Sequence, residues 1–195
     1  MITTEQIKAL REETGVSIMQ CKKALEEAGG DRAKALVILR KKSNEIAEKK
    51  SDRTLLAGAV QSYVHSTGTL GALVLLLCET DFVAKNEEFK SLAYSIAMQV
   101  AAANPEFLTR EEISEETKNT ARSVFEKEVE GKPENLKEGI LKGKLDAYFK
   151  DKILLEQPFI KDPETTVADL LSSAIQKFGE KIEIARFTRF SVKNP

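Results

Sequence analysis

The feature that most constrains the fold is an apolar run of nine residues from Leu70 to Cys78. Such a run is typical of a buried strand, and it is far shorter than the roughly 20 residues needed to span a bilayer. Because both faces of this strand are apolar, we expect it in the centre of a covered sheet. The alternation over residues 57–64 and the turn Ser66-Thr67-Gly68 predict a preceding strand that pairs with it as a hairpin.

The first part of the chain, residues 1–42, predicts a compact module of three short helices. Helical spacing places apolar residues on one side of each helix, and they are Ile7, Leu10, Ile18, Cys21, Leu25, Ala28, Ala35, Leu36 and Leu39. The expected helix starts are marked by Thr3 with Gln6, Ser17 with Gln20, and Asp31. Residues 43–54 are rich in Lys, Glu and Ser without an apolar stripe, so we interpret them as a solvated helical linker.

The remainder, residues 55–195, predicts an α+β core whose small antiparallel sheet is covered by helices. A helical arm is expected over about 111–150, where apolar positions become sparse. Further elements are a helix from Glu87 to Ala102, a connector broken by Pro158, a helix from Val167 to Phe178 that ends at Gly179, and a strand from Ile182 to Val192. Strict alternation in that last strand puts Ile184 and Arg186 on one face, with Ala185 and Phe187 on the other.

Composition limits the classes of function. A net charge of −1 gives no basic field, so we expect no nucleic-acid partner. Cys21 and Cys78 lie in apolar patterns and are expected to be buried thiols in a reducing compartment. A single histidine, His65, cannot build a metal site alone. The N-terminal residues lack the features of a signal or transit peptide, so we expect a cytoplasmic protein without a membrane anchor.

The sequence contains no convincing catalytic motif. The segment Gly139–Lys144 is one residue too short between its glycines for a phosphate loop, lacks Ser or Thr after the lysine, and lies in a helical pattern. No pair of carboxylates lies within an apolar run as a tuned acid and base would. We therefore expect a protein that is not an enzyme and has no metal or cofactor.

The segment Glu79–Asn86 follows the apolar run directly and joins a carboxylate, Asp81, to a large aromatic, Phe82. In isolation, this pair is most often a helix cap and a core residue. The motifs on either side of it favour a different interpretation.

Seven motifs, in order along essentially the whole chain, resemble the family of bacterial translation elongation factor Ts. They are Leu10–Gly15, Met19–Leu25, Gly30-Asp31, Thr80–Lys85, Leu155–Phe159, Lys177–Lys181 and Arg186–Phe190. The resemblance implies a guanine-nucleotide exchange factor that binds elongation factor Tu carrying GDP and promotes release of Mg²⁺ and GDP, so that GTP can bind. It also implies that the three-helix module is similar to the ubiquitin-associated fold and docks on the GTPase domain of Tu.

The resemblance names two sets of partner-binding residues. The first set, near the magnesium site of Tu, consists of Thr80, Asp81, Phe82 and Val83; the second, in the N-terminal module, consists of Met19, Lys22 and Lys23. For Asp81 two roles stay open, an electrostatic effect on the magnesium site or a cap for the helix that begins near Asn86. For the two lysines, a solvated helix face is an equally good interpretation.

The chain has one core unit where longer family members have two related ones. Short members supply the missing half by dimerising, so the resemblance implies a symmetric homodimer that binds two Tu molecules in a 2:2 complex. Thr188 occupies the closing strand where a covalent link would need a cysteine, so the dimer is expected to be non-covalent. The alternative function is a non-catalytic adaptor with a three-helix recognition module, which gives no reason for Thr80–Lys85 or Leu155–Phe159.

Overall fold

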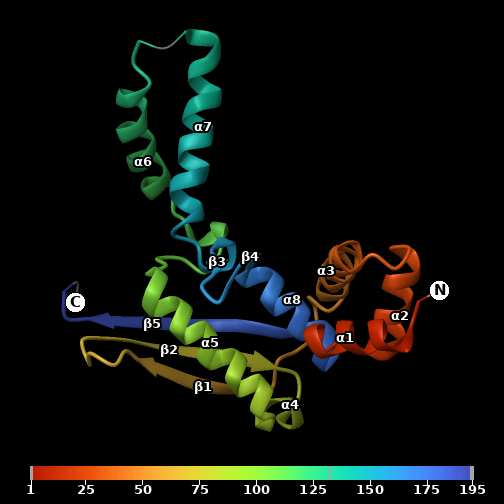
Figure 1. Cartoon of the computed structure of the whole chain (residues 1–195). Helices are drawn as coiled ribbons and strands as arrows, with labels where there is room; N and C mark the ends of the chain where they lie inside the picture. The colour runs from red at the N-terminus through yellow and green to blue at the C-terminus, as the bar shows by residue number, and fades with distance from the viewer. Residues whose placement is uncertain (1, 132, 194–195) are drawn as a thin grey trace.

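The computed structural model describes residues 2–131 and 133–193, and it is an α+β protein. Figure 1 shows three parts: an N-terminal group of helices, a sheet crossed by a long helix, and an arm that extends away from both. The N-terminal helices are α1 (Thr4–Thr14), α2 (Ile18–Glu27) and α3 (Arg32–Glu48). Thr3 and Gln6 form the expected capping box, and Asp31 accepts a hydrogen bond from the Lys34 amide at the start of α3.

The segment expected as a helical linker begins as a direct continuation of α3, which runs to Glu48. Ser43 is buried, and its hydroxyl donates hydrogen bonds to the Leu39 carbonyl and to the side chain of Gln176. Ile46 and Ala47 pack against the main core. Residues 43–48 are therefore an extension of α3 with one packed side, so the expectation of a solvated segment fails at Ser43, Ile46 and Ala47, while most of the rest of residues 43–54 is exposed.

The main sheet is antiparallel, with strands in the order β1 (Ala57–Val64), β2 (Leu70–Cys78) and β5 (Ile182–Ser191). The apolar run is the central strand, as predicted. Its alternate side chains Ala72, Val74, Leu76 and Cys78 are buried beneath helix α5 (Glu87–Ala103), which runs across the strands in Figure 1. Helix α8 (Val167–Phe178) packs beside α3 and contributes to the same core.

Helices cover one face of the sheet, and in the single chain the other face is open to solvent. On the face opposite α5, Leu73 is 44% exposed and Phe190 is 62% exposed, and Val60 also faces solvent. We call the apolar residues of this face, Val60, Val64, Leu73, Leu75, Leu77 and Phe190, the open sheet face. The helices of the core lie on the other side.

The strict alternation expected for the last strand is wrong. A bulge interrupts the pairing, since Leu75 faces Arg186 while the next residue, Leu76, faces Ile184. The extra residue, Ala185, shifts the pattern by one position. Ile184 is therefore buried, whereas Arg186 lies on the open sheet face.

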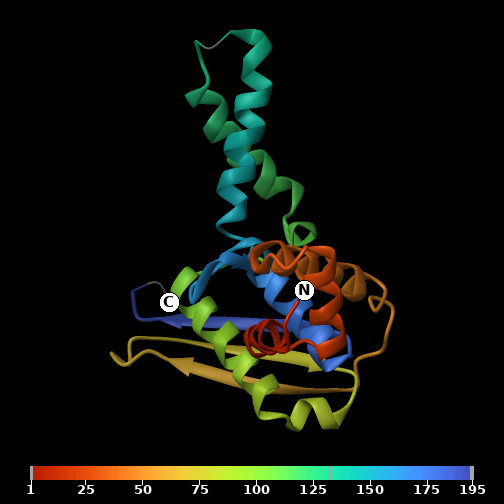
Figure 2. The same cartoon turned by 45° about the vertical axis from the view of Figure 1, so that its right-hand side comes forward.

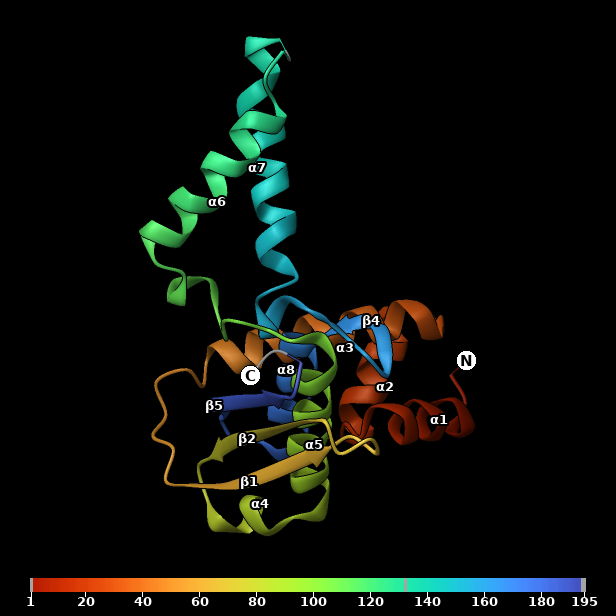
Figure 3. The same cartoon turned by 90° about the vertical axis from the view of Figure 1, so that its left-hand side faces the viewer.

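Between α5 and α8 the chain forms the arm and a small hairpin. The elements are η1 (Arg110–Glu112), α6 (Glu115–Glu128), α7 (Glu134–Lys150), η2 (Leu154–Glu156), β3 (Pro158–Phe159) and β4 (Asp162–Thr166). The expected helical arm over about 111–150 begins with the short helix η1, and α6 follows after Ser114, whose hydroxyl accepts a hydrogen bond from the Thr117 amide. Figure 3 shows α6 and α7 converging toward the far end of the arm.

The two ends of the arm meet at its base. The Glu106 amide donates to the Lys152 carbonyl (2.9 Å), and the Leu154 amide donates to the Phe107 carbonyl (2.8 Å). A small separate cluster of buried residues, Ile113, Ala121, Phe149 and Ile153, fills this base. In Figures 1 and 2 the arm lies far from helix α4, which follows β2 at the other end of the molecule.

Candidate partner-binding site

Helix α4 (Asp81–Lys85) is a single turn that presents an aromatic side chain to solvent. Phe82 is 85% exposed, although a phenylalanine gains roughly 1.5–3 kcal/mol when it is fully buried. Its neighbours Val83 and Ala84 point the other way and pack against the main core. Phe82 is therefore not a core residue, and the core interpretation of this position is wrong. We call Thr80–Val83 the tip.

Asp81 does not cap the following helix. That cap is Asn86, whose side-chain oxygen accepts a hydrogen bond from the Glu88 amide (2.8 Å) at the start of α5. The Asp81 carboxylate is exposed and pairs with Lys85 one turn later (2.6 Å). The Lys85 ammonium lowers the pKa of Asp81, so a negative charge is maintained beside Phe82.

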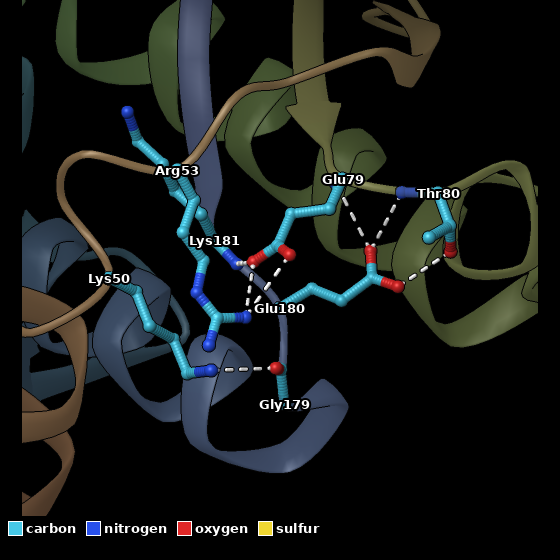
Figure 4. Close-up of polar contacts among 7 residues, drawn as sticks. All are labelled: Lys50, Arg53, Glu79, Thr80, Gly179, Glu180 and Lys181. Atoms are coloured by element: carbon cyan, nitrogen blue, oxygen red, sulfur yellow. Dashed lines mark hydrogen bonds and ion pairs between the residues drawn. The ribbon is translucent and has the colours of Figure 1, made fainter.

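The chain that leads into α4 is fixed by the carboxylate of Glu180, which lies just after α8 (Figure 4). One carboxylate oxygen accepts the backbone amides of Glu79 (3.1 Å) and Thr80 (3.0 Å). The other accepts the Thr80 hydroxyl (2.5 Å). A single side chain therefore holds three donors at the start of the tip.

Glu79 makes the reverse contact, from the end of β2 to the turn that contains Glu180. Its carboxylate accepts the Lys181 amide (2.5 Å) and the guanidinium of Arg53 (3.1 Å). The Lys181 amide lowers the pKa of Glu79 most, and Arg53 lowers it further. Nearby, the Lys50 ammonium donates to the Gly179 carbonyl (2.8 Å). We call this reciprocal arrangement of Glu79 and Glu180 the carboxylate clamp.

Cys78, the last residue of β2, lies directly under the tip. Its thiol donates to the Thr80 carbonyl (3.2 Å), and burial, with a further contribution from Glu180, raises its pKa to about 11. The thiol is therefore neutral near pH 7 and cannot serve as a thiolate nucleophile there.

The second set of predicted residues lies on α2. Met19 is exposed, and Lys22 and Lys23 follow it at a spacing that puts all three on one side of the helix. The Lys22 ammonium lies 3.8 Å from Glu26. Ile18, expected in the module core, is instead exposed beside Met19. Within the part of the chain that the structure describes, no hydrogen bond or ion pair joins this set to the tip.

Two residues beside the tip, Leu56 and Glu180, were not predicted from the sequence. Leu56 is 83% exposed, and its amide bonds the Cys78 carbonyl (3.2 Å), which places it at the same end of the sheet. An apolar residue before a strand ordinarily indicates core, so its pattern gave no signal. Glu180 was missed because its partner Thr80 is 100 residues away. Its only signal was its place in the Lys177–Lys181 motif.

Other kinds of site find no support in residues 2–131 and 133–193. No group of three or more His, Cys, Asp or Glu side chains there could hold a metal ion. None of the helices described is long and apolar enough to cross a membrane.

Comparisons with known proteins agree with the motifs. The family model described as "Elongation factor TS" matches residues 17–194. A protein named elongation factor Ts from Carboxydothermus hydrogenoformans is 50% identical over 98% of this chain and 89% of its own length. Others of that name, from Thermodesulfovibrio yellowstonii and Thermotoga petrophila, are 46% and 47% identical over 98% of this chain and 96% of their own lengths. The chain therefore belongs to the elongation factor Ts family of translation elongation factors.

Proposed function

We propose that this protein is a guanine-nucleotide exchange factor for elongation factor Tu. It binds Tu carrying GDP, promotes the loss of Mg²⁺ and GDP, and leaves the site open for GTP during the elongation stage of protein synthesis. This activity needs no covalent chemistry, no cofactor and no contact with nucleic acid or membrane, and it takes place in the cytoplasm. Family membership supports the role in translation.

The observation that carries the proposal is the exposed Phe82 on a fixed base. A large apolar side chain held in solvent is suited to insertion into another protein, because its burial there is favourable and its position is already set. The negative charge of Asp81 stands beside it and can act electrostatically on the magnesium site of Tu. In this proposal the tip meets Tu near its magnesium site with Asp81 and Phe82 in front, while Val83 stays packed on the main core.

Phe82 cannot supply the whole effect. A factor that weakens nucleotide binding to Tu about 10⁴-fold must bind nucleotide-free Tu about 5.5 kcal/mol more tightly than it binds nucleotide-bound Tu, because the coupling is reciprocal. Burial of one phenylalanine provides roughly 1.5–3 kcal/mol. Loss of Mg²⁺ coordination and contacts elsewhere supply the rest. We assign part of those contacts to Met19, Lys22 and Lys23 on the N-terminal module.

The test is release of labelled GDP from purified Tu with catalytic amounts of this protein. An exchange factor accelerates release from many Tu molecules per molecule of factor. An adaptor that only binds Tu gives at most a stoichiometric effect, and that result would overturn the proposal.

We also propose that a second copy of the chain covers the open sheet face. The face is continuous across three strands, and its centre is the apolar strand β2. A two-fold axis through it would place the same apolar patch of each chain against that of the other. Thr188 lies on this face opposite Leu73, so the contact is non-covalent. The resulting homodimer binds two Tu molecules.

Light scattering tests the dimer. The wild-type protein is expected at twice the mass of one chain, and Leu73→Lys at the mass of one. Val124→Lys, at an exposed apolar position on α6, is the control and should stay dimeric. A wild-type protein that is monomeric at micromolar concentration would contradict the proposed dimer. That result would leave the proposed exchange activity untested.

A further inference from the structure

We infer that Glu180 is a positioning residue for nucleotide exchange: its carboxylate sets the direction in which Phe82 leaves the core. The inference rests on the proposed exchange activity and adds a residue outside the tip. Glu180 belongs to the turn between α8 and β5, and it faces Thr80 rather than solvent (Figure 4).

The first support is the geometry at the end of the sheet. Regular pairing of β2 with β5 stops at Cys78 and Ile182. One residue further, the amides of Glu79 and Lys181 bind carboxylates of the carboxylate clamp where a ladder would offer carbonyl groups. The chain can therefore leave the plane of the sheet toward α4 while its donors stay satisfied.

The second support is that the Thr80 hydroxyl binds Glu180 rather than capping α4. Thr80 is the N-cap residue of α4, yet its hydroxyl makes no capping bond to the helix. It donates to Glu180 instead. A helix of five residues does not hold itself in place, and the exposed pair of Asp81 and Lys85 adds little. The orientation of α4 thus depends on the clamp before it and on Val83 and Ala84 beneath it.

The third support is the chemical demand on residue 180. The site presents two backbone amides, which only donate and share one carboxylate oxygen, and the Thr80 hydroxyl, which donates to the other. Glutamine could keep its oxygen on the two amides, but its NH2 would then meet the Thr80 hydroxyl, which would have to turn round and accept, and the negative charge would be lost. Aspartate would retain the charge but is shorter by one methylene. Glu180→Gln is therefore the sharpest variant, because it keeps the shape of the side chain and removes an acceptor.

The experiment measures exchange on Tu carrying GDP as a function of Tu concentration. Glu180→Gln should lower the maximal rate about tenfold, the scale expected when a charge-assisted set of hydrogen bonds is lost. The Tu concentration at half-maximal rate should change less than about twofold, because the surface of α2 is untouched. Glu88→Gln is the matched control, since Glu88 pairs with Lys177 of α8 (2.8 Å) without contacting the tip. It should retain the wild-type rate.

A double-mutant cycle with Phe82→Ala separates positioning from general structural damage. If Glu180 acts through Phe82, then Glu180→Gln should have less than about a twofold effect once Phe82 is alanine. If the two losses multiply, the inference is overturned. A wild-type rate for Glu180→Gln overturns it as well.

Should Glu180→Gln fail to fold, Thr80→Val provides the second variant. It removes only the hydroxyl donor and keeps the backbone amide bound to Glu180. It should lower the maximal rate about threefold, and Phe82→Ala should abolish that difference. A wild-type maximal rate for Thr80→Val would overturn the inference. The wild-type protein, run in the same assay, reports on the exchange activity itself, so failure of the proposed function is seen separately.

Discussion

The tip and the arm both extend into solvent, but they are attached to the molecule in different ways. Phe82 stands on one helical turn whose base is the buried end of β2 and the carboxylate clamp. The arm is a pair of long helices with its own small cluster, and outside its base α6 and α7 mainly contact each other. Exposed apolar side chains occur on both, including Val124 and Leu136 on the arm. Exposure alone therefore does not identify a site; exposure on a fixed base does.

The largest expected effect tests this difference directly. Phe82→Ala should slow GDP release from Tu about 10- to 100-fold, because the burial free energy of one aromatic ring is lost from the exchange step. A measurable complex with Tu should remain. Val124→Ala removes an exposed apolar side chain from the arm and should stay within about twofold of wild type. If both variants released GDP at the wild-type rate, the assignment of the tip would be wrong.

The next effect concerns the base of the tip and its pH dependence. Because Lys181 and Arg53 lower the pKa of Glu79, the folded state binds a proton less readily than the unfolded state. The stabilisation that the ionised Glu79 carboxylate gives to the folded state is fully present above the unfolded pKa of about 4.3. It is lost as the pH falls through the pKa of Glu79 in the folded state.

Glu79→Gln should accordingly be less stable than wild type by about 1.5 kcal/mol at pH 7. Denaturant unfolding at a series of pH values should show this gap narrowing below about pH 4. A gap that is independent of pH would show that the charge of Glu79 is not what holds the clamp.

A smaller effect is expected at the base of the arm. The Arg110 guanidinium binds Glu156 (2.5 and 2.8 Å) and Asp146 (3.1 Å), but all three side chains are partly exposed. Arg110→Gln should therefore cost roughly 0.5–1 kcal/mol. Hydrogen exchange should quicken in α6 and α7 while β2 stays protected. Equal acceleration in β2 would mean that the arm and the core open as one unit.

The smallest effect is expected when the outer half of the arm is removed. A variant with residues 124–141 replaced by a short Gly/Ser linker keeps the buried cluster at the base. GDP release should change less than about twofold, because α6 and α7, as far as the structure describes them, lie away from the tip. A tenfold loss would place a Tu contact on the arm and end the distinction between the two regions.

Local signals predicted much of this architecture. Strand β2 and helix α8 appear at the expected residues, because a nine-residue apolar run and a terminal glycine each act over a short range. The N-terminal caps at Thr3 and Asp31 are local in the same sense.

The errors have a common cause in contacts made across the sequence. The buried side of residues 43–48 exists because α3 packs on α8, through pairs such as Ser43 with Gln176. The bulge at Ala185 is defined by pairing with β2. The exposure of Phe82 also depends on how α4 is seated, which its residue pattern did not specify.

The distance along the chain between Thr80 and Glu180 has a consequence for how the protein folds while it is being synthesised. At synthesis rates of about 5–20 residues per second, the carboxylate that fixes the tip is made about 5–20 s after the tip itself, since the two residues are 100 positions apart. The hairpin of β1 and β2 forms from neighbouring segments, whereas β5 and Glu180 are still absent at that stage. An unfinished chain therefore carries Phe82 without its fixed direction. In the proposed mechanism, the tip therefore takes up the direction needed for nucleotide exchange only near the end of the protein's own synthesis.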